Sequence, residues 1–304
     1  MPFQMTNITR PGTAFHVPSP LSWLPLIVLP TTVAIAGTGW PAWIFMWSLA
    51  FAIYAGLKWL SFAACTDCER ASVGRSWGYL LLWPGMDAKR FLTSTRRAPA
   101  PPFTEWVAAT ANTAFGASLL LWIVPIAAQE SPFVAGWIGW VGIAFVLHFG
   151  LLHLLSLCWR LAGVDAPPIM DAPIKATSLG EFWGRRWNLA FRDLAYNFVF
   201  QPLLRRCGVA GATLAVFLVS GLIHDVVISG SVGAGIGLPT IYFLIQGLGL
   251  FVERSPFGKR IGLGRGVIGW LYCGMVTIAP VGLLFHRPFI ERVVIPMLAA
   301  FRVL

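Results

Sequence analysis

The stretch Ala210–Ile228, AGATLAVFLVSGLIHDVVI, decides the fold class. It has about the 20 mostly apolar residues that a helix needs to cross a bilayer. It also contains His224, and an ionisable side chain inside a membrane is expensive and usually functional. The segment therefore predicts a membrane-spanning helix that carries a chemically active imidazole.

The composition of the whole chain supports a membrane protein. Of its 304 residues, 57% are hydrophobic and only 11% are charged, whereas soluble domains have about 25% charged residues. The mean hydropathy is +0.73. A soluble protein this apolar would expose large hydrophobic patches. We predict an all-α, polytopic transmembrane helix bundle that forms one integral-membrane domain, residues 1–304.

Apolar stretches recur along most of the chain and predict seven spans, within a range of six to nine. The predicted spans are Leu21–Gly37, Pro41–Ala64, Trp106–Ala127, Val134–Leu161, Val209–Ser229, Gly235–Val252 and Val267–Phe285.

Three further segments are ambiguous. Trp77–Gly85 is too short to span and is expected to be re-entrant or interfacial. Phe289–Leu304 is expected to be an interfacial helix or a short final span. Leu189–Leu204 has polar residues in an apolar background, which suits a helix at the interface or inside the bundle.

The basic residues alternate between loops. They are abundant in Cys65–Glu105, in Ala162–Arg206 and between Arg254 and Arg265, whereas Gln129–Phe133 and Gly230–Ala234 have none. The positive-inside rule places the basic loops in the cytoplasm. The N-terminal tail, residues 1–20, is then cytoplasmic and shows no cleavable signal peptide. In a bacterium the expected location is the plasma or inner membrane.

The net charge of +10 is best explained by the same loops. They set the topology and meet anionic lipid headgroups or an anionic cosubstrate. The sequence has no RNA-binding signature and no basic low-complexity tail, so nucleic acid is not an expected partner.

The cysteines and the remaining histidines give only weak metal signals. Cys65 and Cys68 have the C-x-x-C spacing of zinc and redox sites, but no second pair accompanies them, and two ordinary thiols are the simpler expectation. His148 and His153 are five residues apart, which is not the i, i+4 spacing of a helical metal pair. No metal site is predicted.

A second polar cluster lies upstream of His224. Phe182–Asn188, FWGRRWN, contains two arginines, two tryptophans and an asparagine. Arginine recognises phosphate or carboxylate through its planar fork, and tryptophan favours the membrane interface. Alone, the cluster could equally be an anchor on anionic lipid.

The two pieces together resemble a known family. FWGRRWN followed by a span with Ser220, Gly221 and His224 is similar in order and spacing to the motifs of the membrane-bound O-acyltransferase superfamily, wax-synthase-like branch. The blocks YLLLWPGMD (Tyr79–Asp87) and LFHRPFIERVVIP (Leu284–Pro296) also look like that branch. One departure is Asp225, which stands where the branch usually has glutamate.

The resemblance implies a role for five residues. His224 matches the catalytic base, and Asn188 matches the asparagine that helps to form the reaction site. Trp183, Arg185 and Arg186 match the flank of that motif, which could bind the phosphates of an acyl-CoA donor. The implied fold is a helix bundle with a central tunnel.

We therefore predict an O-acyltransferase that uses acyl-CoA as a cosubstrate and needs no cofactor. The expected acceptor is the hydroxyl of a lipophilic molecule, in the first place a long-chain alcohol, which would make the product a wax ester. Membrane lipids are the other expected partners. The alternatives are acylation of an extracytoplasmic sugar, polymer or secondary metabolite, a non-enzymatic transporter or lipid-binding protein, and a family member that has lost its activity.

Overall fold

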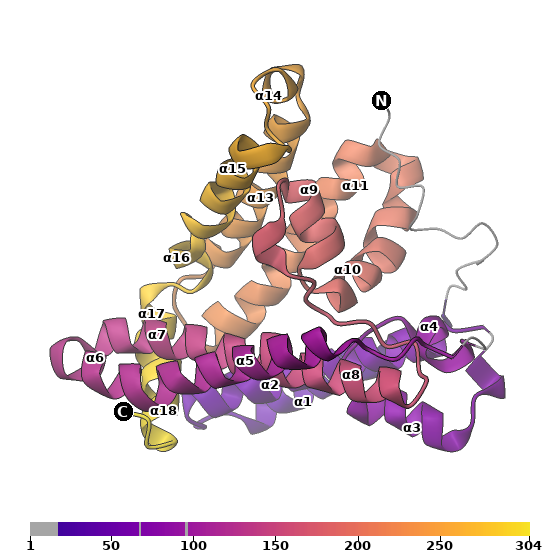
Figure 1. Cartoon of the computed structure of the whole chain (residues 1–304). Coiled ribbons are helices and arrows are strands. Elements are labelled where there is room, and N and C mark those ends of the chain that lie inside the picture. The colour runs from indigo at the N-terminus through magenta and orange to yellow at the C-terminus, as the bar shows by residue number, and fades with distance from the viewer. Residues whose placement is uncertain (1–17, 67, 95–96) are drawn as a thin grey trace.

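The computed structural model describes residues 18–66, 68–94 and 97–304. Within these residues the chain is helical, with no strand, as predicted (Figure 1). Most of the predicted N-terminal tail lies outside the described residues.

Eighteen α-helices are present in the described ranges, several of them continuous with one another through wide π-helical turns. Their bounds are α1 Leu24–Ala36, α2 Ala42–Ala63, α3 Val73–Leu82, α4 Ala88–Thr93, α5 Phe103–Ser118, α6 Val124–Glu130, α7 Pro132–Ala144, α8 Leu152–Leu161, α9 Leu179–Glu181, α10 Leu189–Ala195, α11 Gln201–His224, α12 Gly230–Val232, α13 Leu238–Arg254, α14 Pro256–Arg260, α15 Gly266–Ile278, α16 Val281–Leu284, α17 Arg287–Phe289 and α18 Ile295–Ala300.

Five continuous helical stretches are long and apolar enough to cross a membrane. They are Ala42–Ala63, Phe103–Glu130, Pro132–Leu161, Leu189–Val232 and Gly266–Leu284. Each contains most of one predicted span.

The other two predicted spans are also helical but shorter. They correspond to Pro20–Ala36 and to α13, which has 17 residues. At 1.5 Å per residue, 17 residues reach about 26 Å, somewhat less than the roughly 30 Å hydrocarbon core. The number of spans therefore stays a prediction.

The helices form two groups that lie at an angle to each other (Figure 1). Helices of the first half of the chain, including α2 and α5 to α8, lie side by side across the lower part of the view. Helices α11, α13 and α15 rise from this layer, and α11 packs directly against α13. His224 is the last residue of α11 and therefore belongs to the second group.

The C-terminal segment returns to the first layer. The π-helical turn Ile290–Val294 packs against α7 and α2. Phe289, Ile290, Val293 and Val294 are fully buried there. This part of Phe289–Leu304 is therefore a core element, which the sequence pattern alone did not indicate.

The ambiguous segment Leu189–Leu204 is a helix that leads into the span containing His224. It is α10, a π-helical turn and the start of α11. The break that separates it from the span falls at Gly208, whose φ of 66° and ψ of −177° interrupt the helix. Glycine is suited to this position because it has no Cβ to oppose a positive φ.

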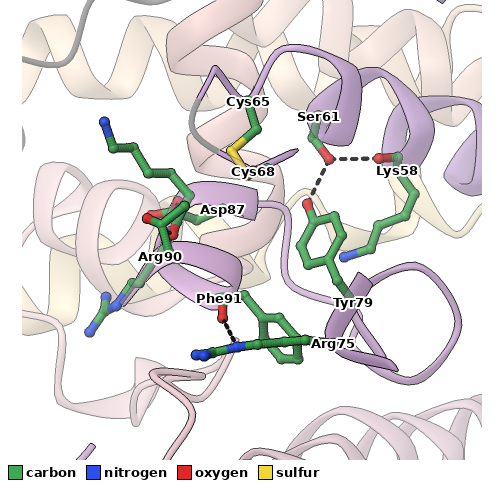
Figure 2. Close-up of a disulfide and its surroundings, with 11 residues drawn as sticks. Lys58, Ser61, Cys65, Cys68, Arg75, Tyr79, Asp87, Arg90 and Phe91 are labelled. Carbon is green, nitrogen blue, oxygen red and sulfur yellow. Dashed lines mark hydrogen bonds between the residues drawn. A yellow bond between two sulfur atoms is a disulfide. The ribbon is translucent and has the colours of Figure 1, made fainter. Parts of the chain in front are cut away.

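Cys65 and Cys68 form a disulfide next to the C-terminal end of α2. Figure 2 shows the bond and its surroundings. The expectation of two separate thiols here is therefore wrong. The two Cα atoms are 5.5 Å apart, which is within the range that a disulfide can bridge.

The segment Trp77–Gly85 is held by a buried polar cluster (Figure 2). Its helical part belongs to α3, and an extended stretch follows. The buried amine of Lys58 donates to the Gly85 carbonyl oxygen and lies 3.3 Å from the centre of the Tyr79 ring. The Tyr79 hydroxyl is 2.7 Å from the Ser61 oxygen. These contacts fix the segment to α2.

Candidate active site

A cavity of about 640 Å³ lies among the helices of the second group. Its walls come from α9, the FWGRRWN segment, α10, α11, α13, α14 and the loop between α14 and α15. The volume is within the range typical of small-molecule sites, roughly 300–1,000 Å³. His224 and Asn188, which are 36 positions apart in the chain, both line it.

His224 is the last residue of α11 and faces this cavity. Its Nδ1 is 2.7 Å from the Ser220 carbonyl oxygen one turn earlier. A carbonyl can only accept, so Nδ1 carries the proton and Nε2 presents a lone pair. Within the described residues Nε2 has no hydrogen-bond partner. The imidazole is therefore set in the tautomer that a general base requires.

The aromatic ring of Phe243, on α13, packs against the imidazole with the two ring centres 4.6 Å apart. Phe243 also contacts Trp183, at 5.7 Å between ring centres. Trp183 lies edge-on against Phe217, at 5.8 Å. These aromatic contacts connect the FWGRRWN segment to His224.

Asn188 ends the FWGRRWN segment and begins α10. Its backbone is left-handed, with φ 41°, a conformation that asparagine tolerates better than most residues. Its side-chain Oδ1 accepts a hydrogen bond from the Phe191 N–H at 3.3 Å and so caps α10. The amide NH₂ has no partner among the described residues and remains available as a donor at the cavity wall.

Of the three predicted donor-binding residues, two line the cavity and one does not. Trp183 and Arg185 line the cavity, and Arg185 is exposed. The indole N–H of Trp183 is buried without a partner in the described part of the chain. Arg186 is not part of the cavity wall. It pairs with Glu181 at 2.7 Å and donates to the Asp171 carbonyl oxygen at 3.1 Å.

Glu181 is engaged as an acceptor. Partial burial would raise the pKa of Glu181, but hydrogen bonds from the Thr177 N–H and from Arg186 outweigh it and hold this pKa below its usual value. Arg186 therefore balances a charge of the protein itself.

The cavity is also lined by four further basic residues, which the motifs did not indicate. They are Arg192 on α10, Arg254 on α13, Lys259 on α14, and Arg265 in the loop between α14 and α15. In the charge pattern, the last three indicated only the orientation of the chain. Their density between Arg254 and Arg265 was the available signal, but only the fold brings that loop to the FWGRRWN segment.

Glu253 joins these two regions. Its carboxylate accepts hydrogen bonds from the Leu179 N–H at 2.6 Å and from the Gly180 N–H at 3.4 Å. The C-terminal end of α13 is thereby attached to α9, immediately before FWGRRWN. In the ranges that the structure describes, no group of three His, Cys, Asp or Glu side chains could hold a metal ion.

Residues 166–245, which include both motifs, match the membrane bound O-acyl transferase family. This match agrees with the resemblance of the two motifs to the membrane-bound O-acyltransferase superfamily and its wax-synthase-like branch. The match to a membrane-bound family and the five long apolar helices together support an integral membrane protein.

Several curated relatives are similar over part of their length. The long-chain-alcohol O-fatty-acyltransferase of Simmondsia chinensis is 36% identical over 156 residues, 45% of this chain and 44% of that protein. A probable long-chain-alcohol O-fatty-acyltransferase of Arabidopsis thaliana is 31% identical over 166 residues, 49% and 48% of the two chains.

A third relative has a different acceptor in its name. The acyl-CoA–sterol O-acyltransferase 1 of Arabidopsis thaliana is 31% identical over 94 residues, 29% of this chain and 27% of that protein. The chain thus aligns with less than half the length of each of these three relatives.

Proposed function

We propose that this protein transfers a fatty acyl group from acyl-CoA to the hydroxyl of a long-chain alcohol. The observation that carries the proposal is the shared cavity, which combines an imidazole with a free Nε2, an unengaged asparagine amide and a set of cationic side chains. The names of the Simmondsia chinensis and Arabidopsis thaliana relatives favour a long-chain alcohol as the acceptor.

In the proposed reaction, His224 Nε2 removes the proton of the alcohol as its oxygen attacks the thioester carbonyl carbon. The new C–O bond forms and the carbonyl oxygen becomes an oxyanion. The C–S bond then breaks, and the CoA sulfur leaves with the proton from His224. The products are an ester and free CoA, and the imidazole returns to its starting tautomer.

Asn188 is proposed to stabilise the oxyanion. Its side-chain oxygen is occupied as the cap of α10, so the group it can offer to the reaction is the NH₂ donor. A fixed donor aimed at developing negative charge typically contributes roughly 2.7–4 kcal/mol to catalysis.

The cationic side chains are proposed to bind the phosphates of CoA. Arg185, Lys259 and Arg265 line the cavity, whereas the nearby carboxylates of Glu181 and Glu253 are already engaged by local donors. This end of the cavity is therefore electropositive and suits a polyanion. The same residues belong to loops that the charge pattern assigns to the cytoplasm, so we propose that the donor enters from that side.

Replacement of His224 tests the proposed function. His224→Gln in purified protein should reduce transfer from labelled acyl-CoA to a panel of long-chain alcohols by about 10²–10⁴-fold, the usual contribution of a general base. His148→Gln is the matched control, because His148 is also in a predicted span but does not line the cavity.

The control should keep the wild-type rate. Retention of most activity by His224→Gln would refute the role of the imidazole. If the wild-type protein transfers to sterols or sugars but not to alcohols, the acceptor assignment fails and the acyltransferase assignment stands.

A further inference from the structure

Asp225, the neighbour of His224, binds the beginning of α13. Its Oδ1 accepts from the Gly237 N–H at 2.7 Å, and its Oδ2 accepts from the Thr240 N–H at 3.0 Å and from the Thr240 hydroxyl. Gly237 is the N-cap of α13, and Thr240 is the third residue of the helix. The carboxylate of one helix therefore caps another.

α13 depends on this external cap. Its N-cap is glycine, which has no side chain to accept a hydrogen bond, and Pro239 in its first turn has no N–H. The first N–H groups of a helix need acceptors and carry partial positive charge. The carboxylate of Asp225, at the C-terminal end of α11, satisfies two of them and complements that charge.

The same short region holds the base in place. Gly221 approaches the Thr240 backbone so closely that a Cβ there would be 2.6 Å from the Thr240 Cα. Phe243, one turn later on α13, packs against the imidazole. The position of α13 along α11 thus decides what covers the face of His224.

Asp225 makes no hydrogen bond to His224. The Nδ1 of His224 is bonded to the Ser220 carbonyl oxygen. The other partner of the carboxylate is the hydroxyl of Ser229, which donates to Oδ1 at 3.1 Å and is 3.2 Å from His286 Nε2. His286 Nδ1 in turn accepts from the Phe289 N–H at 3.3 Å.

This second set of contacts ties Asp225 to the C-terminal segment. The three residues Ser229, His286 and Asp225 do not form a nucleophilic triad, because Ser229 is fully buried and its oxygen lies between the other two groups. Their arrangement is a support for α13 and for the loop before it.

We propose that Asp225 is a positioning residue for the acyl transfer: by capping α13 from α11, it holds Phe243 against His224 and keeps the Nε2 lone pair directed into the cavity. The inference rests on the proposed function. It also gives Gly221 and Asp225 of the S-G-x-x-H-D motif a task, since Gly221 permits the close approach of α13 and Asp225 fixes that helix, while the backbone carbonyl of Ser220 sets the tautomer.

The test compares Asp225→Asn, Asp225→Glu, Thr240→Val and the double variant Asp225→Asn/Thr240→Val. Ser231→Ala is the matched control, because the Ser231 hydroxyl bonds to the Ile228 carbonyl oxygen and does not contact Asp225. For each purified variant, kcat and KM for acyl-CoA are measured together with backbone amide hydrogen exchange in residues 237–243.

Asp225→Asn should lower kcat by about 10- to 100-fold, the size expected when a catalytic group is displaced by about 1 Å. KM for acyl-CoA should change by less than about 2-fold, because the donor end of the cavity is formed elsewhere. Exchange at Gly237 and Thr240 should accelerate. Thr240→Val should have a smaller effect in the same direction, and the double variant should resemble Asp225→Asn, because the two groups share one interaction.

Asp225→Glu should recover part of kcat, because it restores the charge and both acceptors. Accelerated exchange with an unchanged kcat would overturn the inference, and so would a change confined to KM. If Asp225→Asn does not fold, Thr240→Val decides the same question. If the wild-type protein transfers no acyl group, the proposed function fails, while the exchange data still test whether Asp225 caps α13.

Discussion

Gly221→Ala is expected to damage the site through a single methyl group. In this structure the added Cβ would be 2.6 Å from the Thr240 Cα and 3.2 Å from the Thr240 Cβ. The atom met is backbone, so no side-chain rotation can relieve the overlap. Ordinary contact begins near 3.4 Å, and α13 must therefore move by roughly 0.8 Å (3.4 minus 2.6) away from α11.

That movement has two consequences of known size. Overpacking of a well-packed contact costs about 1–3 kcal/mol, against which the lower entropy of the unfolded alanine chain returns about 0.4–1 kcal/mol. A shift of this size would also lengthen the 2.7 Å bond from Gly237 to Asp225 to about 3.5 Å, beyond the normal hydrogen-bond range. We expect a lower thermal stability and a fall of about 10- to 100-fold in kcat.

The assay is transfer of a labelled acyl group by purified protein, with thermal unfolding in detergent measured in parallel. Gly230→Ala is the matched control, because a Cβ there would meet only the Asp225 carbonyl oxygen, at an ordinary 3.7 Å, in a helical backbone. The control should be as active and at least as stable as the wild type. Wild-type kcat and stability in Gly221→Ala would refute the argument that α11 and α13 meet at this point.

Three further outcomes are expected. Asn188→Asp should preserve the fold, because aspartate also caps a helix in this backbone conformation. Its kcat should fall steeply, because the NH₂ donor is lost and a negative charge would face the oxyanion. A near-normal kcat would exclude the oxyanion role. Arg185→Gln should raise KM for acyl-CoA and weaken the salt dependence of this KM, whereas Arg186→Gln should mainly lower thermal stability. Equal effects of the two variants on KM would contradict the different roles of these arginines. Denatured protein should react with three maleimide groups before reduction and with five after it, as counted by mass spectrometry, because Cys65 and Cys68 are joined by a disulfide. Five groups before reduction would mean that the disulfide is absent.

Much of the helical content could be predicted from the sequence because the bilayer imposes a simple rule on it. A span needs a long apolar run, and the runs that contain α2, α5, α7 and α15 are visible without any tertiary information. A boundary between Leu204 and Val209 was predicted, but its form was not: the helix is interrupted at Gly208 alone, and a glycine is compatible with either a straight or a broken backbone.

The motif residues of the site were also visible in the sequence. His224 and Asn188 stand out because polar groups with chemical capacity are rare in such surroundings, and both line one cavity. The basic residues at Lys259 and Arg265 were visible too, but the same charge pattern serves topology and ligand binding equally well. Their place at the cavity could not be deduced from loop charge.

By itself, then, the sequence determined the long apolar helices, the resemblance to a family and the presence of a histidine in an apolar span, since each depends on local composition and on short motifs. Only the tertiary structure decided which neighbours those residues have. It places Arg185 at the cavity and Arg186 in an ion pair with Glu181. It also joins Cys65 to Cys68 in a disulfide and shows that Asp225 caps α13. The physical reason is that a carboxylate or a guanidinium finds its partner through space, and the partner of Asp225 is the open end of a helix that the linear pattern does not identify.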